Sequence, residues 1–107
     1  MTEPVIQIRP ATTEDARMLW MWRNNPDVRA ASLSTEVIPF ESHLVWFTAS
    51  MADASRDILI AEQDSHPIGM VRFDTDGEIA DINILLDPQA RGRGLAKQVL
   101  AEAIAFS

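Results

Sequence analysis

The sequence contains no cysteine and no tyrosine, and its only lysine is Lys97. Without cysteine the chain forms no disulfide, no zinc–thiolate site and no thiolate nucleophile. No apolar run approaches the roughly 18–20 residues that span a bilayer, and the start, Met-Thr-Glu-Pro, is unlike a signal peptide. These absences predict a cytoplasmic protein with no metal site and no membrane partner.

Charge is unevenly distributed along the 107 residues, whose net charge is −7. An acidic chain is a poor general binder of polyanions, so we predict no nucleic-acid partner. Yet three of the nine basic residues, Arg91, Arg93 and Lys97, fall within seven positions. This local basic spot indicates a discrete anionic ligand, or alternatively a solvated helix start with ordinary surface arginines. The length predicts a single domain over residues 1–107.

The first half of the chain predicts one strand and two helices. Residues 5–9 form a short apolar strand that ends at Pro10, and a helix capped by Thr12 or Thr13 runs to about residue 23. A long mixed connection covers residues 24–39, and a second helix covers about 39–54. The residues expected on one side of each helix are Ala16, Leu19, Trp20 and Arg23 in the first, and Leu44, Phe47, Thr48 and Met51 in the second.

In the second half the apolar period changes from that of a helix to that of a strand. Strands are predicted at 57–63, 68–73 and 78–86, with turns at 64–67 and 74–77. The third strand has apolar residues at both alternating sets of positions, which predicts that both of its faces are at least partly covered. An amphipathic helix follows Gly94. The order of strand, two helices, three strands and helix predicts an α+β (mixed α/β) fold with a mostly antiparallel sheet.

The connection between the third of these strands and the last helix contains two glycines one residue apart, Gly92 and Gly94. Such a loop offers free backbone N–H groups and a helix N-terminus to a phosphate. A dinucleotide-binding fingerprint would need a third glycine where Lys97 stands, and the loop would then follow the first strand. The remaining alternative is a tight strand-to-helix turn without a ligand.

The segment Gln89-Ala90-Arg91-Gly92-Arg93-Gly94 resembles the Gln/Arg-x-x-Gly-x-Gly/Ala signature of the GCN5-related N-acetyltransferase (GNAT) superfamily. That family places the signature after its fourth strand and before its third helix, and the predicted order of elements is the same. The segment from Trp22 to Arg29, Trp-Arg-Asn-Asn-Pro-Asp-Val-Arg, also looks like the end of the first helix in particular branches. Those branches acetylate amino sugars of nucleotide-sugar pathways or protein N-termini.

The resemblance implies acetyl-CoA as the co-substrate. Backbone N–H groups of the glycine loop would hold the pyrophosphate, basic side chains would meet the phosphates, and the strand before the loop would pair with the pantetheine amides. The cofactor-binding residues implied in this way are Ile84, Leu85, Leu86, Gln89, Arg91, Gly92, Arg93, Gly94, Leu95, Ala96 and Lys97.

Direct attack of an amine on the thioester needs a base for the ammonium proton. The candidates are Glu78 and Asp81 on the strand before the loop, although carboxylates near a hairpin are often solvated surface. His43 in the second helix is expected to be a packed histidine rather than a catalytic one.

The resemblance covers the N-terminal two-thirds of the family's domain. Full-length members continue with further strands and a helix, which supply one wall of the cofactor cleft and often a tyrosine acid. Two functions therefore stay open: acetyl transfer to a primary amine of a small molecule or peptide, such as an amino sugar or nucleotide sugar, or non-catalytic acyl-CoA binding or assembly. Because strand 78–86 would leave a sheet edge open, we also expect a homo-oligomer or a longer protein.

Overall fold

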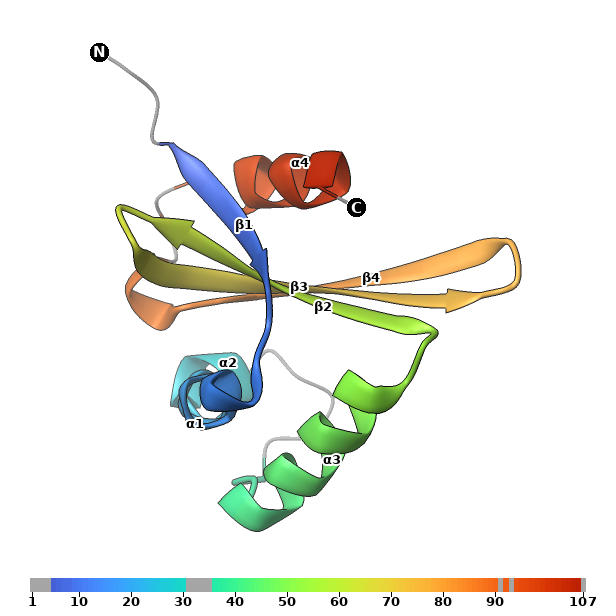
Figure 1. Ribbon diagram of the computed structural model, residues 1–107. Coiled ribbons are helices and arrows are strands. Elements are labelled where there is room, and N and C mark those ends of the chain that lie inside the picture. Colours follow the sequence, from blue (N-terminus) through green and yellow to red (C-terminus); the bar gives the residue numbers. More distant parts are fainter. Residues whose placement is uncertain (1–4, 31–35, 91, 93, 107) are drawn as a thin grey trace.

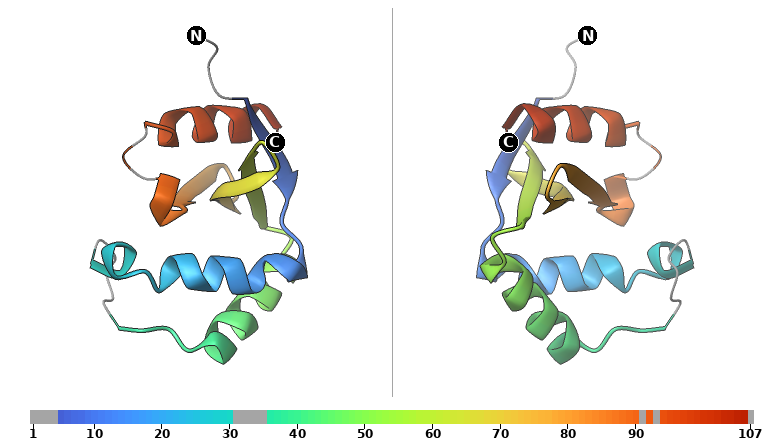
Figure 2. Two further views of the ribbon diagram at one scale, coloured as in Figure 1. Left: turned by 90° about the vertical axis from the view of Figure 1, so that its left-hand side faces the viewer. Right: turned by 90° about the vertical axis from the view of Figure 1, so that its right-hand side faces the viewer.

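The computed structural model describes residues 5–30, 36–90, 92 and 94–106. A four-stranded antiparallel sheet in the order β1-β2-β3-β4 lies between α4 on one face and α1, α2 and α3 on the other (Figures 1 and 2). The α+β class and the order of the main elements are confirmed. No described helix is long and apolar enough to cross a membrane. The elements are β1 (Ile6–Pro10), α1 (Ala16–Arg23), α2 (Pro26–Ala30), α3 (Phe40–Ala52), β2 (Arg56–Gln63), β3 (His66–Asp76), β4 (Ile79–Leu86) and α4 (Ala96–Phe106).

The short helix α2 differs from the sequence expectation, which assigned 24–39 to a mixed connection. Proline at its first position is compatible with a helix start, because the missing N–H has no intrahelical acceptor there. The side chain of Asn25 accepts a hydrogen bond from the Asp27 N–H at 2.9 Å and caps the new turn. Val28 is buried and fixes this turn to the fold. Residues 31–35 of the expected connection lie outside the described residues.

The strand β3 is longer than predicted because both of its hairpin turns have only two residues. Asp64 and Ser65 have φ values of 52° and 66°, as a type I′ turn requires, and Gly77 has a φ of 64° in the second turn. The flanking residues remain paired, Gln63 with His66 and Asp76 with Ile79.

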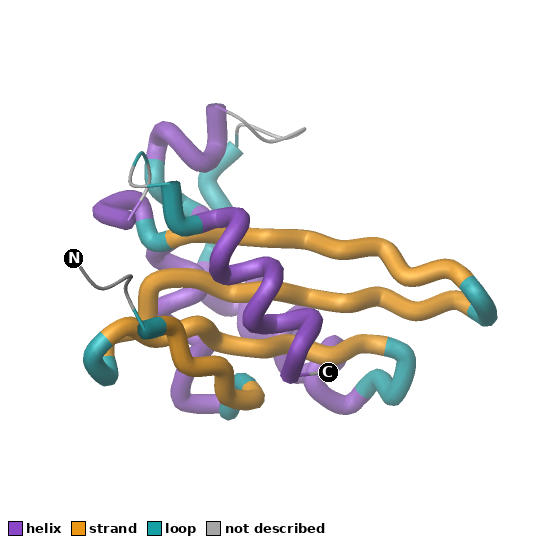
Figure 3. The backbone as a smooth tube through the Cα atoms, turned by 90° about the horizontal axis from the view of Figure 1, so that it is seen from above, coloured by secondary structure: helices purple, strands orange, loops and turns teal. Residues whose placement is uncertain are grey.

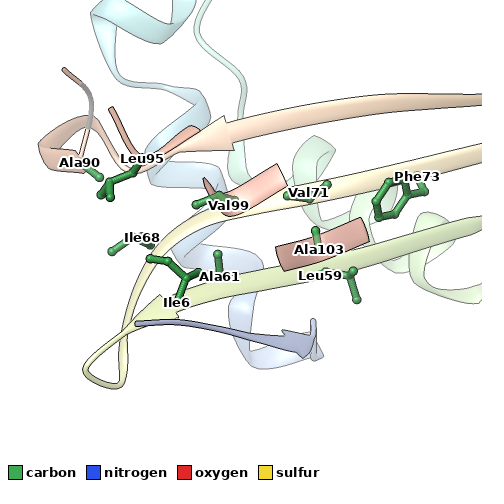
Figure 4. Packing of buried hydrophobic residues seen from close by; sticks show 10 residues of the cluster. All are labelled: Ile6, Leu59, Ala61, Ile68, Val71, Phe73, Ala90, Leu95, Val99 and Ala103. Atoms are coloured by element: carbon green, nitrogen blue, oxygen red, sulfur yellow. The ribbon is translucent and has the colours of Figure 1, made fainter. Parts of the chain in front are cut away.

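The strands β2 and β3 are apolar on both faces, and each face has its own core. Facing α4, Leu59, Ala61 and Val71 pack with Val99 and Ala103 (Figure 4). On the opposite face, residues of the same strands pack against α1 and α3. The second core comprises Ala11, Ala16, Leu19, Trp22, Phe47, Ile58, Ile60 and Met70.

The expectation that both faces of β4 are covered is wrong for most of the strand. Ile79, Ile82 and Ile84 are 70%, 46% and 38% exposed, and only Leu85 and Leu86 are partly buried. The physical reason is position: the far end of the β3–β4 hairpin extends beyond the helices (Figures 1 and 3). Among the described residues β4 pairs only with β3, so its outer edge is open.

The helix α3 is rotated relative to the expected face. His43, Phe47 and Ser50 are its buried residues, whereas Leu44 and Thr48 are exposed. In α1, similarly, Trp22 is buried and Trp20 only partly so. An apolar pattern cannot place a buried histidine, because its burial depends on hydrogen-bond partners supplied by another helix.

His43 joins α3 to α1 through both ring nitrogens. Its Nε2 lies 2.9 Å from the carbonyl oxygen of Ala16, and its Nδ1 lies 3.1 Å from Nη1 of Arg23. Because a guanidinium only donates, Nδ1 accepts and Nε2 carries the proton. The ring also stacks on Phe47, with 5.9 Å between centroids. The sequence expectation of a packed histidine is confirmed by this burial.

We predict that the burial of His43 makes the protein less stable as the pH is lowered. Burial, and after it the charge of Arg23, lowers the pKa of His43 below its ordinary value. The unfolded chain therefore binds a proton that the folded chain does not, and the free energy of unfolding decreases from about pH 7 to about pH 5.5. Its slope is at most about 1.4 kcal/mol per pH unit. Denaturant unfolding across this range should show the slope in the wild type and in His66→Gln, which alters an exposed histidine. It should be lost in His43→Gln, and a full slope in that variant would contradict the assignment.

Candidate functional site

The start of the glycine loop is fixed to the sheet and to the core. After β4, the N–H of Asp87 donates to the carbonyl of Ile68 at 2.9 Å, and the Asp87 carboxylate accepts from the N–H of Gln89 at 3.1 Å. A single 3-10 turn, η2 (Pro88–Ala90), then buries Ala90 against the core below α4. Gln89 itself is exposed.

Gly92 and Gly94 have φ values of +78° and +72°, in the left-handed region that favours glycine. Both are exposed, and a Cβ at either position would meet no atom within 4 Å beyond the adjacent residues of the chain. The glycines are therefore required by backbone conformation rather than by crowding within the chain. The space in front of them is open to a ligand.

The loop ends at the N-terminus of α4. Leu95 is buried, whereas Ala96 and Lys97 are exposed in the first turn, which holds no acidic residue. First-turn N–H groups have no intrahelical acceptor, and the helix dipole is positive at this end. The structure thus brings together Gln89, Gly92, Gly94 and the first turn of α4. The predicted phosphate contacts Arg91 and Arg93 lie outside the described residues.

The outer edge of β4 offers backbone groups at alternating positions. The hydrogen bond from Asp87 to Ile68 fixes the phase, because bonded and non-bonded pairs alternate along an antiparallel ladder. Accordingly, the N–H and C=O groups of Ile84 and Leu86 face the open edge. Those of Leu85, the third predicted pantetheine contact, face β3, and its side chain packs toward α1 and α3.

The candidate bases lie away from the glycine loop. Glu78 is exposed in the turn at the far end of the hairpin, and Asp81 is exposed opposite Asp74 of β3. At about 3.4 Å per residue, Asp81 lies about 17 Å along β4 from Leu86, and Glu78 about 27 Å. Neither belongs to a group of three potential metal ligands among the described residues.

Two hollows meet beside η2. One, of about 470 Å³, lies between the β2–β3 turn and η2 and is bordered by Asp64, His66 and Gln89. The other, of about 360 Å³, lies between α1 and η2 and is bordered by Met18 and Trp22. Asp87 and Gln89 border both. Sequence reasoning did not identify Met18 or His66 as cleft residues, because the hollows arise only where distant segments meet.

The profile of the acetyltransferase (GNAT) domain matches residues 6–107. The chain belongs to this family. The resemblance drawn from the glycine loop is thereby confirmed. Because the loop, the open edge of β4 and α4 occur in the family's order, the family assignment and the geometry agree.

Individual relatives are distant and longer. The acetyltransferase PseH of Campylobacter jejuni is 25% identical over 83 residues, covering 77% of this chain and 52% of that protein. The chain thus spans about half the length of this curated relative.

Solved structures establish the fold. A domain from Methanocaldococcus jannaschii superposes with a TM-score of 0.82 at 21% identity, covering 97% of this chain and 70% of that one. Spermidine N-acetyltransferase from Vibrio cholerae, solved with CoA and spermine, gives a TM-score of 0.80 at 18% identity, covering 94% and 62%.

The end of α1 is fastened beside the second hollow by Asn24. Its amide donates to the Ile38 carbonyl at 2.8 Å and accepts from the Ile38 N–H at 2.7 Å. Trp20 Nε1 donates to the same carbonyl. The family-like segment from Trp22 to Arg29 therefore includes a structural clamp.

We predict that Asn24→Ala destabilises the protein, because it leaves partly buried backbone groups of Ile38 with fewer partners. The free energy of unfolding should fall by about 1–3 kcal/mol. The matched change Asn83→Ala, at an exposed strand position, should cost clearly less. Denaturant unfolding of both variants tests this, and equal losses would show that the clamp is energetically neutral.

Proposed function

We propose that this chain binds acetyl-CoA and transfers its acetyl group to the primary amine of a small molecule such as an amino sugar or nucleotide sugar. The observation that carries the proposal is the exposed glycine loop, which joins the open edge of β4 to the N-terminus of α4. Membership of the GNAT family supports the same conclusion.

In this proposal the pyrophosphate lies against the loop. The absence of a Cβ at Gly92 and Gly94 allows close approach of the backbone, and the first-turn N–H groups of α4 face a negative charge. Lys97 adds a mobile positive charge beside them. Arg91 and Arg93 remain proposed phosphate contacts on sequence grounds.

The pantetheine arm would run along the open edge of β4. Its amides can pair with the free backbone groups of Ile84 and Leu86, as an added strand does at a sheet edge. Leu85 would contribute through its packed side chain rather than through its backbone. Main-chain pairing would hold the thioester in place for attack.

The reaction is nucleophilic attack of the amine nitrogen on the thioester carbonyl carbon. A C–N bond forms, the C–S bond breaks, and the thiolate of CoA leaves and takes up a proton. Before the attack, a base removes one proton from the ammonium group of the acceptor and frees the lone pair of the nitrogen. After the attack, the nitrogen loses a second proton, which balances the proton taken up by the thiolate. We assign the role of the base to Asp81 in preference to Glu78, because Asp81 lies within the strand whose edge would carry the cofactor.

One observation favours a second candidate function, a non-catalytic acyl-CoA-binding or assembly module. The strand β4 exposes three isoleucines and an open edge, which suits association with a second copy of the chain. Binding of acetyl-CoA without release of free CoA across a panel of amines would favour this alternative.

We predict that Gly92→Asp abolishes or strongly weakens acetyl-CoA binding. The new side chain is strained at a φ of +78° and places a negative charge where the pyrophosphate would lie. Gly77→Asp is the matched control, since Gly77 also has a positive φ and open space but lies in the distant hairpin turn. Calorimetric titration should show at least a tenfold loss of affinity for Gly92→Asp alone. Equal affinities in the two variants would remove the loop from the site.

We predict that Asp81→Asn lowers kcat by about 10²–10⁴-fold, the usual contribution of a general base. Acetyl-CoA affinity should be unchanged, because the side chain is not assigned a role in cofactor binding. Glu78→Gln, three residues away in the turn, should retain most of the activity. Thiol release measured with saturating amine distinguishes them, and a larger loss in Glu78→Gln would reverse the assignment.

A further inference from the structure

Two guanidinium groups converge on one tryptophan below the sheet. Arg23 ends α1, Arg72 lies on β3, and Trp46 lies on α3. The Cζ atoms of Arg23 and Arg72 lie 4.7 Å and 5.2 Å from the centre of the Trp46 ring. All three residues are partly buried and retain some solvent exposure.

Of the two guanidinium groups, only that of Arg72 has a carboxylate partner in the described part of the chain. Arg72 donates to Asp74 at 3.1 Å, and the other oxygen of Asp74 lies 3.4 Å from Nε of Arg56, which also lies 4.0 Å from Asp53. Arg23 contacts His43, and no carboxylate among the described residues is within ion-pair distance of it. Burial, and after it the charge of Arg72, lowers the pKa of Arg23. Within this cluster, as far as the structure describes the chain, Arg23 is thus the guanidinium without a carboxylate partner.

The cluster lies beside the proposed base. In the β3–β4 register Arg72 is opposite Asn83, and Asp74 is opposite Asp81. Alternation along β4 places Asp81 and Asn83 on the same face as Leu85, which packs toward α1 and α3. A carboxylate that attracts an ammonium group and guanidiniums that attract an anion are therefore neighbours on one face.

We infer that Arg23 and Arg72, held at Trp46, recognise an anionic group of the acceptor, so that the acceptor is an amine that also carries a phosphate or carboxylate. This inference rests on the proposed function and narrows its substrate class. Guanidinium groups bind phosphate and carboxylate oxygens through paired hydrogen bonds. A polyamine, by contrast, would place further positive charge beside two cations.

Packing alone does not account for the arrangement. One guanidinium at an aromatic ring already provides a cation–π contact. A second one adds mutual repulsion, which the fold tolerates here without a carboxylate for Arg23. An anionic ligand would remove that repulsion on binding.

The test compares matched amines in the thiol-release assay: glucosamine with glucosamine 6-phosphate, propylamine with β-alanine, and spermidine. The phosphate or carboxylate member should have at least a tenfold higher kcat/KM than its uncharged counterpart, and spermidine should be a poor acceptor. The two pairs distinguish phosphate from carboxylate recognition. Equal kcat/KM values within both pairs, or preference for spermidine, would overturn the inference.

Variants test whether Arg23 and Arg72 recognise the anionic group of the acceptor. Arg23→Gln and Arg72→Gln should each raise KM for the preferred anionic acceptor at least tenfold and leave acetyl-CoA affinity unchanged. Arg56→Gln is the matched control, because Arg56 bonds to Ser50 and pairs with Asp74 on the same face. Arg23→Lys keeps the charge and should recover part of the loss. If Arg23→Gln fails to fold by circular dichroism, Arg72→Gln and Arg23→Lys decide the outcome.

Calorimetry with glucosamine 6-phosphate and β-alanine separates this inference from the proposed function. If the wild type does not bind acetyl-CoA, the proposed function is refuted. Binding of either anionic amine that depends on Arg23 and Arg72 would still support the anion site. Binding that is equal in the wild type, Arg72→Gln and Arg56→Gln, or absent from all of them, would refute the anion site.

Discussion

The sheet has two apolar faces, and the need to cover both determines the rest of the architecture. Alternating residues of β2 and β3 enter one core with α4 and another with α1 and α3. The chain must therefore pass from β4, at the edge of the sheet, to α4 in the layer above one face. The connection between Leu86 and Ala96 is short, and it contains Gly92 and Gly94 in left-handed conformations. The open loop beside a helix N-terminus is a direct product of two-sided packing.

On the opposite face of the sheet, His43 links two of the covering helices. An imidazole with both nitrogens hydrogen-bonded joins α3 to α1, and its partner Arg23 also lies over the ring of Trp46. The polar contacts between these two helices also include the guanidinium of Arg23, which lies near Arg72 of β3. Packing and electrostatics are consequently linked at the end of α1, and a change at His43 would reach the charged cluster.

Much of the fold could be predicted from the sequence because its signals are local. A few consecutive residues are enough to recognise the strand periodicity of β2 and β3, the turn at Gly77 and the pair of glycines before α4. The exposure of Ile79 to Ile84 and the rotation of α3 could not be predicted, since both depend on where other elements lie. The same holds for the candidate site: the spacing of Gly92 and Gly94 identified them as candidates, whereas the hollows at Trp22 and His66 required the assembled fold.

The alternation of backbone groups along β4 has an evolutionary consequence. A ligand that pairs with this edge contacts the main chain of Ile84 and Leu86, and the main chain is the same for almost every amino acid. Side chains at these positions are therefore free to change while the edge is preserved. The geometry of such an edge depends on the fold rather than on particular side chains, and chains only 18–21% identical to this one share the fold.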